Sequence, residues 1–125
     1  MNAEIQKLIE RAEDFYLDSQ YLLQGKRFEA VVNRSYYAMF TGVQALLFTK
    51  NVFSKTHQGA QVKFHELFIR TGIIPEGMGK ILNETYEKRQ LSDYDVDAEI
   101  SQIEAEKVLE NTRLFLDKIK TYLDK

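Results

Sequence analysis

The stretch "FEAVVNRSYYAMFTGVQALLFTK", residues 28–50, is apolar on nearly every side when it is drawn as a helix. A helix of this kind is expected at the centre of a bundle, because each of its faces needs a neighbour. At 1.5 Å per residue it would be roughly 33 Å long. A stripe of mostly small residues, including Ala38, Gly42 and Ala45, would let another helix come close. Arg34 and the other polar side chains of this stretch argue against a membrane span.

The rest of the chain predicts helices to surround this one. Apolar residues recur at steps of three and four in each of four further segments. The predicted helices cover residues 3–24, 56–71, 76–92 and 101–123. Gly25 and Gly72 are placed to end two of them, and Ser101 with Glu104 fits a capping box. The predicted fold is all-α: an up-and-down four-helix bundle with an additional short helix, in a single domain over residues 1–125.

Composition narrows the class of protein. With 125 residues and 44% hydrophobic content, the chain can bury one core without covalent staples. It has no cysteine, which excludes disulfides and fits a cytoplasmic protein, and its charged N-terminus predicts no secretory signal. The net charge of −2 does not suggest a broad nucleic-acid binder. Positive residues are concentrated at 50–70, so an anionic ligand is expected to approach the middle of the chain.

The common signatures of metal and cofactor chemistry are missing. "GIIPEGMGK", residues 72–80, lies between two predicted helices and lacks the Ser or Thr that follows the lysine of a phosphate-binding loop. His57 and His65 are eight residues apart on one predicted helix, about 80° apart around its axis, and no nearby ligand completes a set. We therefore predict no metal site and no cofactor.

Arg34 places a fixed charge among aromatic and apolar residues, and two roles are open for it. It could be a buried arginine held by a carboxylate, with Asp93 as the first candidate, because an unpaired buried charge costs several kcal/mol. It could instead contact a phosphate, which the planar guanidinium grips with two parallel hydrogen bonds. The sequence leaves both roles open.

Three short stretches resemble one known family. They are "NRSYYAMF" at 33–40, "KTHQG" at 55–59 and "YEKRQLSDYD" at 86–95. Their order and spacing are similar to those of stand-alone HEPN-domain proteins, the higher eukaryotes and prokaryotes nucleotide-binding domain. The resemblance covers almost the whole chain and implies a helical bundle that dimerises. It also implies a small nucleotidyltransferase as partner, in a toxin–antitoxin pair whose HEPN member is a metal-independent ribonuclease.

The chain departs from the ribonuclease motif of that family. Ribonucleolytic members carry an arginine followed at a short distance by a histidine, and neither Arg34 nor Arg89 is followed by one. Tyr94 stands where the histidine would follow Arg89, and a tyrosine with a pKa near 10 is a poor base at neutral pH. His57 could supply an imidazole from another helix.

These observations lead to one prediction of the site and three of the function. The expected ligand-binding residues, from three helices and a loop, are Arg34, Tyr37, His57, Arg89, Asp93 and Tyr94. Of these, the candidate catalytic residues are Arg34, His57, Arg89 and Tyr94. We expect a homodimeric nucleotide- or RNA-binding partner of a small nucleotidyltransferase. The alternatives are a metal-independent endoribonuclease toxin and a non-catalytic structural interaction module.

Overall fold

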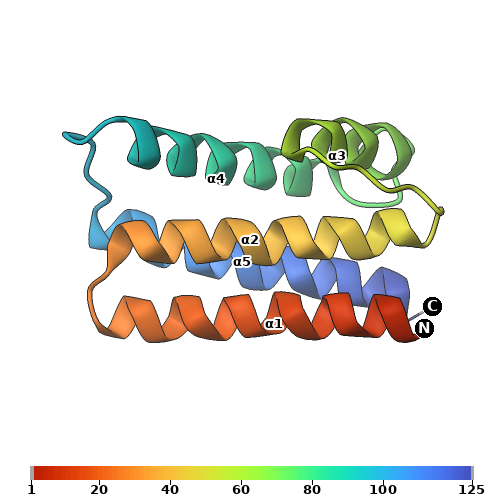
Figure 1. Cartoon of the computed structure of the whole chain (residues 1–125), viewed down its shortest axis with the longest axis horizontal. Coiled ribbons are helices and arrows are strands. Elements are labelled where there is room, and N and C mark those ends of the chain that lie inside the picture. Colours follow the sequence, from red (N-terminus) through yellow and green to blue (C-terminus); the bar gives the residue numbers. More distant parts are fainter. Residues whose placement is uncertain (1, 125) are drawn as a thin grey trace.

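A computed structural model describes residues 2–124, and within them all regular structure is helical (Figure 1). The elements are α1 (Ala3–Gln24), α2 (Phe28–Phe48), α3 (His57–Phe64), the π-helix η1 (His65–Ile69), α4 (Glu76–Tyr94) and α5 (Gln102–Leu123). The all-α helical bundle that the sequence predicted is therefore confirmed. No helix in this part of the chain is both long and apolar enough to cross a membrane.

The helix ends follow the signals in the sequence. Gly25 is the C-cap of α1, and Gly72 has the left-handed φ of +80° that favours glycine. At the start of α5, Ser101 Oγ accepts from the Glu104 backbone N–H at 3.1 Å. Glu104 Oε1 accepts from the Ser101 N–H at 3.3 Å, which completes the predicted capping box. These local signals fix where the long helices begin and end.

Helix α2 is the central element, as predicted. It has more buried residues than any other helix, and Figure 1 shows it between α1 on one side and the α3–α4 layer on the other. Its small-residue stripe lies against α5. A Cβ atom added at Gly42 would be 2.8 Å from Ile119 Cδ1 and 3.3 Å from Leu116 Cδ2. The two helices can approach this closely because residue 42 has no side chain.

A cluster of charges joins α1 to α5. Arg113 donates to both carboxylate oxygens of Glu13 at 2.8 and 2.9 Å, and Lys120 Nζ donates to Glu13 Oε1 at 3.0 Å. The Arg113 hydrogen bonds are the largest cause that lowers the pKa of Glu13 to about 2. Arg113 also stacks over the Tyr16 ring at 4.7 Å. This cluster, which the sequence did not reveal, fixes α1 against the last helix.

The third helix differs from its prediction. Residues 56–71 were expected to form one continuous α-helix, but the chain widens into the π-helix η1 after Phe64. Phe64 and Phe68 are both buried, and their stacked rings lie 6.3 Å apart. A π turn contains one extra residue, which changes the direction in which later side chains point. Phe64 and Phe68 are four residues apart, so they share one face of the segment and enter the core together.

Candidate functional site

The N-terminal cap of α3 fixes the position of His57. Thr56 is the N-cap, and its Oγ1 accepts from the Gly59 N–H at 2.9 Å. A Cβ at Gly59 would lie 2.5 Å from Ser54 Oγ and 2.7 Å from Thr56 Oγ1, so only glycine leaves room for these two hydroxyls. The "KTHQG" stretch thus forms a cap that holds His57 in the first turn of the helix.

A hydrogen-bonded chain links His57 to the core. His57 Nδ1 lies 2.8 Å from Tyr36 Oη, and Gln61 Nε2 donates to the same oxygen at 3.2 Å. Burial raises the pKa of Tyr36 to about 12, so its hydroxyl keeps its proton at neutral pH. The Tyr36 hydroxyl has one proton and two lone pairs, so beside Gln61 it either donates to His57 Nδ1 or accepts from it, according to the tautomer of the imidazole.

The environment of His57 favours the neutral imidazole. Burial is the larger cause that lowers the pKa of His57, and the positive charge of Arg89 lowers it further. The ring is stacked on Phe40, with centroids 4.3 Å apart and planes 29° apart. A neutral His57 whose Nδ1 accepts a hydrogen bond is a donor through Nε2, and it is a poor proton acceptor in this tautomer.

Arg89 is held against two tyrosines. Its guanidinium carbon lies 5.4 Å from the centroid of the Tyr36 ring and 5.1 Å from that of Tyr37. Nη2 donates to Tyr37 Oη at 3.2 Å and lies 3.7 Å from Asp93 Oδ2. The Arg89 Nε atom is buried and has no hydrogen-bond partner. An arginine oriented by aromatic rings and not fully paired with carboxylates is suited to hold an anion.

A cavity of about 220 Å³ opens beside these residues. Its lining, which we call the His57 cleft, consists of Arg11, Phe15, Tyr37, Phe40, Thr41, Gln44 and His57. Arg34 stands at its edge, where its guanidinium lies 5.9 Å from the centroid of the Phe15 ring. Phe15 is in turn 6.0 Å from Tyr37 between ring centroids. Arg11 lines this cavity, whereas Arg34 and Arg89 contact its aromatic walls Phe15 and Tyr37, so positive charge lies in and around the cleft.

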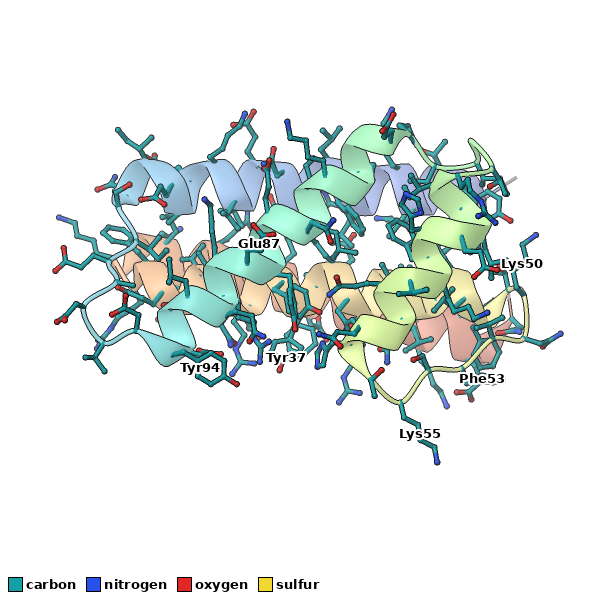
Figure 2. The ribbon with its side chains drawn as sticks, turned by 90° about the horizontal axis from the view of Figure 1, so that it is seen from above. Tyr37, Lys50, Phe53, Lys55, Glu87 and Tyr94 are labelled. Carbon is teal, nitrogen blue, oxygen red and sulfur yellow. The ribbon has the colours of Figure 1, made fainter. Side chains whose placement is uncertain are left out.

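The structure brings together four of the six predicted site residues. Tyr37, His57, Arg89 and Asp93 are linked by the contacts described above. Tyr94 is 82% exposed and lies at the outer end of α4, apart from Tyr37 (Figure 2). It therefore does not line the His57 cleft.

The expectation that Arg34 is a buried arginine held by Asp93 is wrong. Arg34 is exposed on α2, and the carboxylate of Asp93 lies beside Arg89, four residues earlier on α4. The Arg34 guanidinium lies over the Phe15 ring of α1, and the side chain stays open to solvent there. The stripe that does pack closely against α5 contains Gly42.

Sequence reasoning missed several residues of the site. Arg11 and Phe15 come from α1, and Gln61 and Tyr36 complete the hydrogen bonds of His57. Each had a signal in its spacing. Arg11 and Phe15 are four residues apart and share a helix face, as do His57 and Gln61. What the sequence did not show is which helix faces lie opposite one another.

The chemistry available in the cleft is the recognition of an anion. Arg11 lines the cleft as a donor, and Arg34 and Arg89 stand against its aromatic walls. The described residues contain no group of three His, Cys, Asp or Glu side chains that could hold a metal ion. The aromatic rings add flat apolar surface beside the charges. A phosphate attached to a flat ring system fits both properties.

The sequence is similar to one protein family and to several individual proteins. The family model described as the HEPN domain matches residues 5–122. The chain is 40% identical over 120 residues to a protein of Methanocaldococcus jannaschii named "Putative toxin MJ0142", covering 96% of this chain and 82% of the relative. It is 38% identical over 120 residues to "Putative toxin MJ0605" of the same organism, covering 96% and 89%. A "UPF0332 protein" of Thermotoga maritima is 34% identical over 128 residues, covering 97% and 95%.

Proposed function

Because the chain belongs to the HEPN-domain family, we propose that it is a toxin-like HEPN protein that binds the phosphate of a nucleotide or of RNA in the His57 cleft. The similarity to two proteins named as toxins supports the toxin-like role. The resemblance described in the sequence analysis supports a small nucleotidyltransferase as its partner and a second copy of the chain as its dimer mate.

One observation carries the proposal of phosphate binding. Arg89 is fixed over the rings of Tyr36 and Tyr37, and its side chain is 17% exposed. The carboxylate of Asp93 is 3.7 Å away and 45% exposed, so it neutralises Arg89 only weakly. A phosphate oxygen is the kind of acceptor that such a guanidinium binds.

The ribonuclease alternative is favoured by one specific contact. His57 and Arg89 both lie against Tyr36 and Tyr37, so an imidazole and an arginine share one site although no Arg…His motif is present. The hydrogen bond to Tyr36 occupies Nδ1 in either tautomer, so Nε2 is the ring nitrogen left to face a ligand. In the tautomer that carries its proton on Nε2, His57 would support binding by donating to a phosphate oxygen.

Titration of the purified chain with a single-stranded RNA tests the proposal. We expect binding that weakens with added salt, since cations on the protein replace counterions of the phosphates. Arg89→Gln should weaken binding and reduce the slope of log K against log salt by about 1. Arg70→Gln, an exposed arginine at the end of η1 that does not line the His57 cleft, is the matched control and should weaken binding less than Arg89→Gln.

Two outcomes separate the candidate functions. Cleavage of the RNA without metal, abolished by His57→Gln, would favour the ribonuclease. Absence of any RNA or nucleotide binding would contradict the proposal and leave the structural interaction module. Circular dichroism of each variant shows whether the fold is kept, so that a loss of binding can be assigned to the site.

A further inference from the structure

A second cavity continues the His57 cleft along the groove between α1 and α3. Its volume is about 250 Å³, and α2 forms its floor. It is lined by Glu4, Leu8, Gln44, Leu47, Phe48, Val52, Phe53, Ser54 and Ala60. Gln44 lines both cavities. Helix α1 also contributes to both, through Leu8 in this cavity and Arg11 in the cleft, less than one turn apart.

The walls of this cavity are apolar and its rim is polar. Leu8, Leu47 and Phe48 supply the apolar surface, whereas the Glu4 carboxylate and the Gln44 amide supply groups that can bind a polar edge. Within residues 2–124, the half-buried Gln44 amide makes no hydrogen bond through its side chain. An amide that is partly removed from water without a partner suits a ligand that supplies one.

Phe53 gives the cavity an open aromatic wall. Its ring plane is nearly perpendicular to that of Phe48, at 87°, with centroids 5.2 Å apart. The Phe53 side chain nevertheless remains 72% exposed. Figure 2 shows Phe53 on the segment that leads to α3, with Lys50 and Lys55 at the same end of the molecule. Exposed aromatic rings between positive charges are the usual platform for the bases of single-stranded nucleic acids.

We propose that this cavity is a nucleobase subsite for the same ligand whose phosphate binds in the His57 cleft. The inference rests on the proposed function. A nucleotide has a charged part and a flat, mostly apolar part with a polar edge, and the two cavities that meet at Gln44 offer one environment for each. The Gln44 amide can form two hydrogen bonds with the N6 and N7 edge of adenine, and the Glu4 carboxylate can accept from an amino group. Uracil has no amino group, and its two carbonyl oxygens would repel the carboxylate, so we expect adenine to be preferred to uracil.

The test compares 5′-AMP, 5′-UMP and ribose 5-phosphate by chemical-shift titration of the parent and two variants. Ribose 5-phosphate keeps the phosphate and loses the base. We expect the parent to bind 5′-AMP at least tenfold more tightly than ribose 5-phosphate, and more tightly than 5′-UMP. Phe53→Ala should remove most of the advantage of 5′-AMP and leave the affinity for ribose 5-phosphate unchanged. Tyr21→Ala, which removes a 78% exposed ring from α1, is the control.

The results distinguish failure of the subsite from failure of the site. Equal affinities for 5′-AMP and ribose 5-phosphate, or an unchanged affinity of Phe53→Ala for 5′-AMP, would overturn the base subsite and leave the phosphate site standing. If none of the three compounds binds and RNA does not bind either, the proposed function itself fails. A preference for 5′-UMP would overturn the assignment of Gln44 and Glu4 to an adenine edge.

Discussion

Arg34 contacts the ring of Phe15 on the surface of α2, and no buried carboxylate depends on it. A cation over an exposed ring contributes about 0.5–1 kcal/mol. We therefore expect Arg34→Ala to lower the free energy of unfolding by no more than about 1 kcal/mol while RNA binding weakens. Thermal melts and RNA titration measure the two effects, and Arg34→Lys should bind with intermediate affinity.

A large loss of stability in Arg34→Ala would instead indicate a buried ion pair between Arg34 and Asp93. A loss of about 3–5 kcal/mol in Arg34→Ala, partly recovered when Asp93→Asn is added, is expected only if the two side chains form a buried pair. Because Asp93 lies beside Arg89 and is 45% exposed, we expect Asp93→Asn to rescue nothing.

The pKa of His57 gives a second prediction for a single residue. Burial and the charge of Arg89 both hold the pKa of His57 below 6.5. The unfolded chain then binds a proton more readily than the folded chain, so stability falls as pH decreases through 6.5. Proton NMR of the His57 ring should show a midpoint below 6.5 in the parent, and a higher one in Arg89→Gln because one cause is removed.

Arg70→Gln is again the control and should leave the His57 midpoint where the parent has it. A parent midpoint at or above 6.5 would contradict the packing of His57 against Phe40 and Arg89 described here. So would an Arg89→Gln variant whose midpoint does not rise.

The residue types of the site could be predicted from the sequence, but their partners could not. The spacing of "NRSYYAMF" and "KTHQG" singled out Tyr37 and His57, which the structure brings within 5.9 Å between ring centroids. The pairing of Arg34 with Asp93 failed because α2 is apolar on nearly all sides, so its pattern does not say which face a neighbour leaves uncovered. The exposure of Arg34 depends on how the other helices pack around α2, which is a tertiary property.

At the scale of helices, we expect the contact between α1 and α5 to depend on the charge of Glu13. Glu13→Gln removes the acceptor charge for Arg113 and Lys120, and should lower the free energy of unfolding by about 1–2 kcal/mol at pH 7. The folded pKa of Glu13 is lowered from 4.5 to about 2, so its contribution is present above pH 4.5 and is lost as pH falls toward 2. The free energies of unfolding of parent and variant should therefore converge as pH falls. Urea unfolding at several pH values measures them.

Glu106→Gln, an exposed carboxylate on the same helix as Arg113, provides the comparison and should change stability little at any pH. If the free energy of unfolding of Glu13→Gln stays below that of the parent by a constant amount down to pH 2, the loss comes from packing. The charge cluster then does not stabilise the contact as described.

Helix boundaries were the most predictable feature at this scale, because caps are local. Gly25, Gly72 and the Ser101–Glu104 pair act within a few residues of their own position. The π-helix after Phe64 was not predictable from the same reasoning, since periodicity in a short segment does not reveal one extra residue.

The whole molecule is expected to form a symmetric dimer. Four exposed apolar side chains lie on the last part of α4, the loop that follows it and the first turn of α5: Leu91, Tyr94, Val96 and Ile103. Exposed apolar surface of this kind is common where another chain binds. Sedimentation at micromolar concentration should show a dimer, and Leu91→Glu should shift it toward monomer.

Leu17→Glu is the matched control, since Leu17 and Leu91 are each 57% exposed and lie on different helices. It should leave the dimer intact. A parent chain that sediments only as a monomer contradicts the dimer, and a dimer broken equally by both variants would place the interface elsewhere.

The π-helix η1 sets a new rotational offset between the residues before it and those after it. In a continuous α-helix each residue turns the next by about 100°, so the direction of His57 and Gln61 would dictate that of every later side chain in the segment. The wider turn at His65–Ile69 contains one additional residue, so the residues that follow it are rotated by about 100° from where an uninterrupted helix would place them. A one-residue deletion in η1 would remove this offset and redirect the chain that leads to the buried Ile74.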